Sequence, residues 1–128
     1  MNKKTITALM VEPNEHPRVI QLHTDLDSLQ KAVSIGADYQ GLIELVNLDD
    51  HAVILCNEEG KLIGLLGNRR IGCDVIAGVF YILGSDKHGD LISLTEQQLE
   101  TYKAQFWEPE SFTSQDVEHA MFMRFFTI

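Results

Sequence analysis

The sequence has few cysteines, few positive charges and no long hydrophobic run, and each shortage excludes a class of protein. Its 128 residues include 2 cysteines, and its 10 lysines and arginines face 19 aspartates and glutamates, which leaves a formal net charge of −9. No apolar run approaches the roughly 18 residues that a membrane-spanning helix needs, so we expect no membrane association. The chain also lacks the basic face that neutralises phosphates, so we expect no direct binding to nucleic acid.

Two cysteines cannot build the disulfide framework of a small secreted protein. Cys56 lies in a predicted strand and Cys73 in a connection, with no second pair of cysteines beside them. A chain of this length buries enough apolar surface to fold without a disulfide. We therefore expect free thiols and a cytoplasmic location.

The rest of the composition is that of one folded domain. Hydrophobic residues make up 45% of the chain and charged residues 23%, and both values are ordinary for a globular protein. The sequence has no repeat, no low-complexity segment and no long linker, and its length is close to the commonest domain size. We expect a single domain over residues 1–128, in which residues 107–128 form a C-terminal extension that packs on the domain or on a partner subunit.

The central segment 52–66 predicts a β-hairpin. Two apolar runs flank the polar tip Asn57-Glu58-Glu59-Gly60, and glycine in the last position of such a tip is typical of a hairpin turn. Because both runs are so apolar, we expect this hairpin to lie at the centre of a sheet. Further strands are predicted where residues alternate or are rich in β-branched and aromatic types, namely at 6–11, 18–22, 39–48 and 75–83.

Two helices are predicted from their start signals. One covers residues 28–33 and follows an N-cap at Asp25 or Asp27. The other begins at Ser93 or Thr95, because Thr95 with Gln98 fits a capping box and Ser93 with Glu96 fits one slightly earlier. Together with the strands, these helices predict an α+β fold with a mostly antiparallel sheet of about five or six strands and two helices packed on it.

The C-terminal tail leaves its secondary structure open. Thr113 and Asp116 have the spacing of a helix start, whereas residues 121–128 are apolar on all sides and must be buried in either conformation. The aromatic and β-branched content favours a strand for residues 119–128, and a helix is the alternative. Such dense apolar residues at a terminus either complete the sheet of the monomer or join two copies of the chain.

Polar residues near the predicted hairpin are candidate binding residues, namely Asn57, Glu58, Glu59, Asn68 and Arg69. The adjacent carboxylates of Glu58 and Glu59 can share a proton or hold a hard cation if the turn brings them together. The alternative is a turn in which Asn57 binds its own backbone and both acids face water.

Arg69 belongs to the one adjacent pair of arginines in the chain, directly after Asn68. A guanidinium group in this position can hold a phosphate or a carboxylate through two parallel hydrogen bonds. The alternative is a structural ion pair between Arg69 and one of the many acidic residues.

The other reactive side chains form no recognisable site. None of the five histidines has the spacing to another histidine or to a cysteine that zinc sites show, so we expect no metal and no cofactor. Cys56, inside a strand, fits a small core residue. Catalytic residues stay unassigned, because a catalytic triad assembles in space and spacing along the chain does not exclude one. Nothing in the sequence indicates a catalytic site, which favours a protein that is not an enzyme over an enzyme.

Several segments, in their order along the chain, carry a family resemblance. They are 8–13 (ALMVEP), 56–61 (CNEEGK), 68–69 (NR), 76–80 (IAGVF) and 93–95 (SLT). Over roughly residues 6–106 the chain resembles the bacterial and phage proteins grouped as domain of unknown function 3846, which are common in mobile elements of Gram-positive bacteria. The resemblance implies a small α+β domain and a mobile-element setting, and it implies no reaction.

Three functions are therefore open. The first is a non-enzymatic accessory protein of a phage, plasmid or other mobile element that acts through protein–protein contact or self-association, with the C-terminal segment as the contact. The second is an acidic DNA mimic that blocks a DNA-binding enzyme, because residues 86–118 carry eight acids against two lysines. The third is a small ligand-binding protein or enzyme that uses Glu58, Glu59, Asn68 and Arg69.

Overall fold

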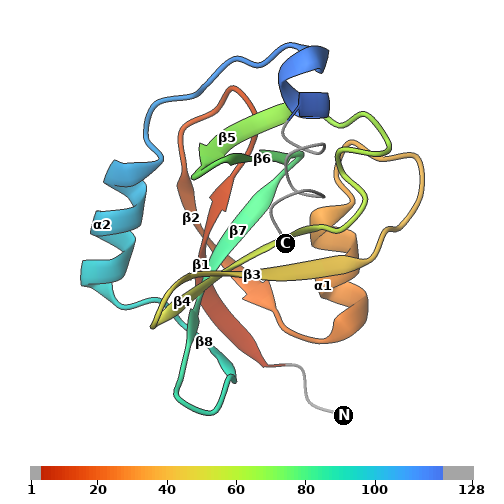
Figure 1. Cartoon of the computed structure of the whole chain (residues 1–128). Coiled ribbons are helices and arrows are strands. Elements are labelled where there is room, and N and C mark those ends of the chain that lie inside the picture. The colour runs from red at the N-terminus through yellow and green to blue at the C-terminus, as the bar shows by residue number, and fades with distance from the viewer. Residues whose placement is uncertain (1–3, 120–128) are drawn as a thin grey trace.

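A six-stranded antiparallel sheet crosses the centre of the protein, with a helix on each face and a small two-stranded sheet at one end (Figure 1). This structure is a computed structural model, and it describes residues 4–119. The strands are β1 (Thr5–Val11), β2 (Arg18–His23), β3 (Ile43–Asp49), β4 (Ala52–Asn57), β5 (Gly67–Ile71), β6 (Asp74–Ala77), β7 (Phe80–Ser85) and β8 (Leu91–Ile92). The helices are α1 (Leu26–Val33) and α2 (Glu96–Gln105), and residues 114–119 are also helical. The predicted α+β class and mostly antiparallel sheet are confirmed.

The strand order explains why some strands are apolar throughout and others alternate. The large sheet runs β2-β1-β7-β4-β3, with β8 beside β7, so β4 and β7 lie in its interior. In the register, Ile82 of β7 lies opposite Leu9 of β1 and Ile54 of β4. All six residues of β4 are buried because both of its faces are covered, whereas the edge strand β3 has an exposed residue at every second position from Leu45 onward.

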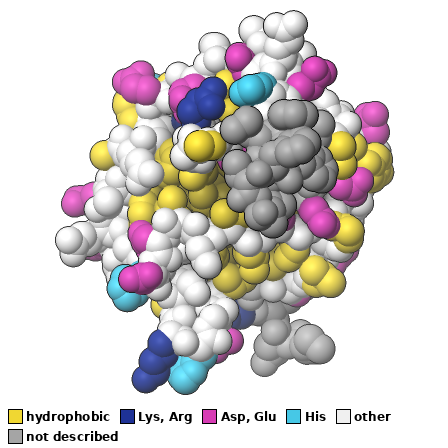
Figure 2. Space-filling model, in the orientation of Figure 1, with side chains coloured by type: hydrophobic (Ala, Val, Ile, Leu, Met, Phe, Trp, Pro, Cys, Tyr) yellow, Lys and Arg dark blue, Asp and Glu magenta, His cyan; other side chains and the backbone are white. Residues whose placement is uncertain are grey.

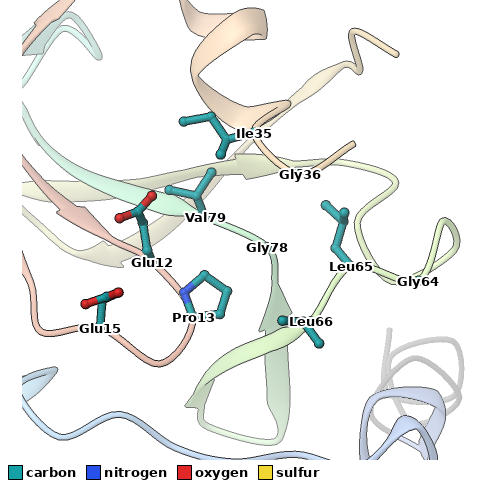
Figure 3. A pocket seen from close by; sticks show the side chains of 10 residues that line it. All are labelled: Glu12, Pro13, Glu15, Ile35, Gly36, Gly64, Leu65, Leu66, Gly78 and Val79. Atoms are coloured by element: carbon teal, nitrogen blue, oxygen red, sulfur yellow. The ribbon is translucent and has the colours of Figure 1, made fainter. Parts of the chain in front are cut away.

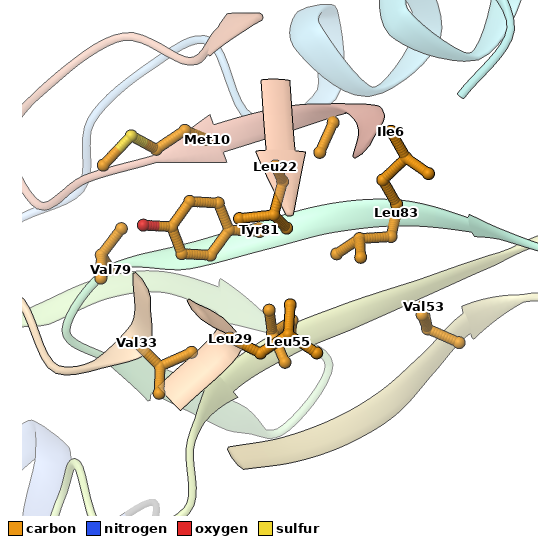
Figure 4. Packing of buried hydrophobic residues seen from close by; sticks show 11 residues of the cluster. Ile6, Met10, Leu22, Leu29, Val33, Val53, Leu55, Val79, Tyr81 and Leu83 are labelled. Carbon is orange, nitrogen blue, oxygen red and sulfur yellow. The ribbon is translucent and has the colours of Figure 1, made fainter. Parts of the chain in front are cut away.

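Two hydrophobic cores lie on the two faces of this sheet. On one face, Leu29 and Val33 of α1 pack toward Leu55 and Tyr81 (Figure 4). On the other face, α2 and the β5–β6 sheet cover a second cluster, in which the rings of Phe80 and Phe106 meet edge to face with centroids 5.6 Å apart. The second core brings the end of α2 against the same strands that support the β5–β6 sheet.

Both predicted helix starts are confirmed by the hydrogen bonds of their caps. The carboxylate of Asp25 accepts a bond from the Ser28 amide at 3.1 Å, which makes Asp25 the N-cap of α1. The Thr95 hydroxyl accepts from the Gln98 amide, and the Gln98 side chain accepts from the Thr95 amide, so the capping box of α2 is complete. These starts are readable in the sequence because each involves residues three positions apart.

The predicted hairpin over residues 52–66 is wrong in its second half. β4 is central, as expected, but it pairs with β3 and β7, and residues 58–64 curl through successive turns. The amide of Ile63 bonds to the carbonyl of Glu59 at 3.0 Å, so this segment folds back on itself instead of extending. Because β3 and β7 already occupy both edges of β4, no hydrogen-bonding edge is left for a further strand after Asn57.

The strand predicted over residues 75–83 is in fact two strands. The chain breaks at Gly78, whose φ of 83° lies in the left-handed region, so β6 pairs with β5 while β7 enters the large sheet. The strand predicted over residues 39–48 begins later than expected, at Ile43. Both differences concern where a strand joins its partner, which the local pattern of apolar residues does not encode.

The described part of the C-terminal extension packs on the β5–β6 sheet. Thr113 and Asp116 exchange side-chain-to-amide hydrogen bonds, as the spacing predicted, and the chain turns helical from residue 114. Phe112 and Val117 contact the buried side chains of β6. The predictions for the apolar residues 120–128 lie outside the described residues. Within residues 4–119, no helix has both the length and the apolar content that crossing a membrane requires.

A short contact between α2 and the end of β3 yields a prediction about pH. The Tyr102 hydroxyl donates a hydrogen bond to Asp49, and this bond holds the pKa of Asp49 below its ordinary 3.8, while burial and the same bond raise the pKa of Tyr102 to about 12. In a Tyr102→Phe variant, the pKa of Asp49 should rise toward its ordinary value, which a carboxyl-carbon NMR titration measures. Tyr81→Phe is the control, because the Tyr81 hydroxyl bonds to the Ala32 carbonyl.

The sign of the effect on stability follows from the lowered pKa. The pKa of Asp49 is lower in the folded protein than in the unfolded chain. The hydrogen bond from Tyr102 therefore contributes its full stabilisation at pH values above the unfolded pKa. This contribution is lost as the pH falls through the folded pKa. The difference in unfolding free energy between wild type and Tyr102→Phe should therefore narrow in acid. An unchanged pKa of Asp49 in the variant would contradict the assignment.

Candidate functional site

A cavity of about 360 Å³ opens beside the β6–β7 junction, between the β1–β2 loop, the C-terminal end of α1 and the turns that follow β4 (Figure 3). Its lining consists of two carboxylates and otherwise of glycine, proline and aliphatic residues: Glu12, Pro13, Glu15, Ile35, Gly36, Gly64, Leu65, Leu66, Gly78 and Val79. Figure 3 shows Glu12 and Glu15 on the side of the β1–β2 loop, across from Leu65 and Leu66. The cavity thus has an acidic side and an apolar side.

Glycine at the β6–β7 junction allows the apolar side to pack closely. A Cβ atom on Gly78 would lie 2.7 Å from Cδ1 of Leu65, so the Leu65 side chain rests directly against the glycine backbone. The Gly78 amide donates to the Leu66 carbonyl at 2.7 Å, which fixes the two segments to each other. Since Gly78 also has a positive φ, a side chain at this position would be strained as well as crowded.

The side chain of Asn68 holds two walls of the cavity together. It is fully buried, and its amide nitrogen donates to the carbonyls of Val11 at 2.8 Å and Gly78 at 2.9 Å. Val11 directly precedes Glu12, and Gly78 directly precedes Val79. One amide group in β5 therefore sets the distance between the end of β1 and the β6–β7 junction.

Arg69 extends this support to α2. Its side chain is 1% exposed, and it donates to the carbonyl of Phe106 at 3.0 Å, to the carbonyl of Glu15 at 2.6 Å and to the side-chain oxygen of Asn68 at 2.9 Å. Burial lowers the pKa of Arg69 from its ordinary value, and the nearby Glu110 carboxylate partly opposes that shift. The guanidinium group thus binds main-chain carbonyls of this chain, and it positions the cavity wall instead of lining it.

A second contact fixes the same loop from outside. The rings of His16 and Trp107 stack with centroids 4.0 Å apart, and Nδ1 of His16 lies 2.6 Å from the Trp107 carbonyl oxygen, a distance at which a protonated Nδ1 donates. Together with Arg69, this contact anchors the β1–β2 loop to two successive residues at the end of α2. The acidic wall of the cavity is therefore held in place before any ligand arrives.

The structure separates the five predicted candidate residues into two groups, namely Asn68 with Arg69, and Asn57 with the two acids that follow it. Asn68 and Arg69 lie together as the buried support of the cavity. Asn57 is also buried, where its side chain donates to the Val33 carbonyl at 3.3 Å and accepts from the Glu59 amide at 2.9 Å.

The two acids beside Asn57 stand apart from both the cavity and the guanidinium group. Glu58 is exposed and Glu59 half-buried, and neither lines the cavity. Within residues 4–119, no hydrogen bond or ion pair joins either acid to Arg69. These contacts do not bring all five candidate residues together in one pocket.

The residues that line the cavity were missed by the sequence reasoning. Glu12, Pro13 and Val79 attract no attention as chemical groups, because two are common surface or turn residues and one is aliphatic. A signal was nevertheless available, since all three belong to segments that carry the family resemblance. Their meeting in space depends on β1 and β7 being neighbours in the sheet.

The acidic residues of segment 86–118 are spread over three parts of the molecule. They lie in the β7–β8 turn, along α2, and in residues 108–118, which Figure 1 places at the bottom, the left and the top. On the face of the molecule that Figure 2 shows, acidic side chains lie at separate places, interrupted by uncharged and hydrophobic ones.

Among the described residues, no group of three or more histidine, cysteine, aspartate or glutamate side chains is arranged to hold a metal ion.

The comparisons with known proteins give one family match, and its bounds agree with those of the domain described above. Neither the curated proteins nor the solved structures include a match to the chain. One family model, Domain of unknown function (DUF3846), matches residues 6–107. The match covers most of the 128 residues and every residue that lines the cavity or supports it. The chain therefore belongs to the DUF3846 family.

Proposed function

We propose that this chain is a non-enzymatic accessory protein of a phage, plasmid or other mobile element, and that it acts in the cytoplasm by binding another protein. The observation that carries the proposal is the cavity with its exposed apolar rim. Leu66 is 66% exposed and Ile35 is 49% exposed, although both lie against a preformed hollow. Large apolar side chains that gather around a cavity are typical of sites that receive the side chains of a partner.

The support behind the cavity favours binding. The loop that carries Glu12 and Glu15 is fixed by Arg69 and by the contact of His16 with Trp107. A site that is already ordered loses little conformational entropy when a partner binds, so more of the contact energy appears as affinity. The ten lining residues include no histidine, cysteine, serine or lysine, and the carboxylates of Glu12 and Glu15 are the ionisable side chains among them.

Two further observations support the setting that we propose. The family resemblance implies a mobile-element context. Cys56 is buried and Cys73 exposed, and the two thiols are not joined in a disulfide, which fits a reducing compartment. The self-association predicted through residues 121–126 lies outside the described residues and stays a prediction.

An aspartate at the rim tests the proposal. In affinity capture from host cells that carry the mobile element, a Leu66→Asp variant should recover its protein partner at about one tenth of the wild-type level or less, because a charge replaces an apolar contact at the edge of the site. The matched control is Leu26→Asp, since Leu26 is 60% exposed at the opposite end of α1. The control should capture the partner as wild type does.

The readout is quantitative mass spectrometry of the captured proteins, with thermal melts to verify that both variants are folded. A partner is a protein that wild type and Leu26→Asp recover and Leu66→Asp loses. If the captured proteins are the same for all three chains, the proposed function is wrong.

A further inference from the structure

The geometry points to a specific occupant: we infer that the cavity receives the lysine or arginine side chain of the partner protein. This inference rests on the proposed function and adds the chemistry of the partner. The two carboxylates line the same space as Leu65 and Leu66, which lie across from them (Figure 3). A lysine or arginine has the complementary division, because its hydrocarbon stem prefers apolar surface and its head is cationic.

The two carboxylates differ in exposure and in ion pairing, and this difference indicates which of them binds the cation. Glu12 is partly buried and already pairs with Arg18 at 3.2 Å, on the surface of β2. The Glu15 side chain is exposed and has no hydrogen bond or ion pair within residues 4–119, while its main-chain carbonyl is fixed by Arg69. Glu15 is thus positioned by its backbone with its charge unpaired, so it is the primary acceptor and Glu12 the second.

The rest of the molecule favours the same class of partner. A net charge of −9 attracts basic proteins over long distance and repels acidic ones, which raises the encounter rate with a basic segment. An acidic ligand would have to enter beside Glu12 and Glu15 at a cost in like-charge repulsion. The cavity volume of about 360 Å³ is at the lower end of ligand pockets, which suits one long side chain better than a large cofactor.

Short blocked peptides test the inference directly. The probes are acetyl-Ala-Leu-Lys-Leu-Ala-amide and its analogues in which norleucine, arginine or glutamate replaces the lysine, titrated into the full chain and followed by amide NMR shifts. The lysine and arginine peptides should shift the amides of Gly36, Gly64 and Gly78, which line the cavity. The norleucine peptide should bind about fivefold more weakly and the glutamate peptide more weakly still. Salt at about 0.5 M should reduce the difference between lysine and norleucine.

A charge-matched pair of variants separates a local effect from the overall field. Glu12→Gln/Glu15→Gln should lose about fivefold in affinity for the lysine peptide. Glu96→Gln/Glu100→Gln removes the same charge from α2 and should bind as wild type does. Equal losses in both double variants would overturn the inference, because they would show attraction by net charge alone.

The remaining outcomes are also decisive. Equal binding of the lysine and norleucine peptides would overturn the inference that the cavity binds a cationic group. It would leave the apolar site and the proposed function unaffected. If free n-butylammonium binds as tightly as the lysine peptide, the site is one for small cations and the assignment to a protein partner is wrong. If Leu66→Asp loses the partner while Glu12→Gln/Glu15→Gln captures it fully, only the inference that the partner inserts a basic side chain is refuted.

Discussion

An Arg69→Ala variant is expected to be less stable than wild type by roughly 3 kcal/mol and to melt about 10 °C lower. The substitution removes the charge-assisted bonds to the carbonyls of Phe106 and Glu15 and leaves both without this donor, and it also empties the volume of a side chain that is 1% exposed. Urea unfolding and thermal melts followed by circular dichroism measure the effect.

Two further variants test whether the hydrogen-bonding pattern of Arg69, and not its charge alone, is responsible for this loss of stability. Arg69→Lys should recover less than half of the loss, because one ammonium group cannot reach acceptors on three sides as the planar guanidinium does. Arg70→Ala is the matched control, since Arg70 is exposed and its side chain lies over the Phe112 ring, and it should change stability by less than about 1 kcal/mol. An Arg69→Ala variant as stable as wild type would refute the structural role.

Asn68→Ala is expected to lower the free energy of unfolding by about 2 kcal/mol, the second largest effect that we foresee. The variant loses one side-chain amide that serves the carbonyls of Val11 and Gly78 and an oxygen that serves Arg69. Asn47→Ala is the control, because Asn47 is exposed on β3, and it should stay within about 0.5 kcal/mol of wild type. Chemical denaturation of both variants gives the comparison.

The two large effects should not add. Asn68 and Arg69 bond to each other, so the double variant should be more stable than the sum of the single losses predicts, with a coupling of about 1 kcal/mol or more. NMR shifts offer a second readout, because Asn68→Ala should move the amides of Glu12 and Gly78 on the two walls that the asparagine joins. Additive losses, with unmoved amides at the cavity, would contradict the role of this pair as one support.

How far the sequence predicts this fold depends on the distance between interacting residues. The N-cap at Asp25 and the capping box at Thr95 are local, and both are correct. Residues 57–60 resemble a hairpin turn locally, yet β4 has its edges filled by β3 and by β7, which follows more than twenty residues later. The apolar pattern locates a central strand, but it does not encode which strand will be its neighbour.

The candidate site shows the same limit more sharply. Asn68 and Arg69 stand out in the sequence as polar residues, and this polarity indicates either a ligand or an internal partner. The partners of Arg69 are carbonyls 54 and 37 positions away, on Glu15 and Phe106. Main-chain carbonyls have no residue identity, so no sequence signal could have announced these bonds. The cavity itself forms where the β1–β2 loop, the end of α1, the turns after β4 and the β6–β7 junction meet, so it becomes visible only in three dimensions.

The stacking of His16 on Trp107 has a spectroscopic consequence. Trp107 is the single tryptophan of the chain, so the ultraviolet emission of the native protein reports on one place alone, where the β1–β2 loop meets the end of α2. That loop carries the acidic wall of the cavity. Intrinsic fluorescence can therefore follow occupancy of the site and loosening of the loop without any attached dye.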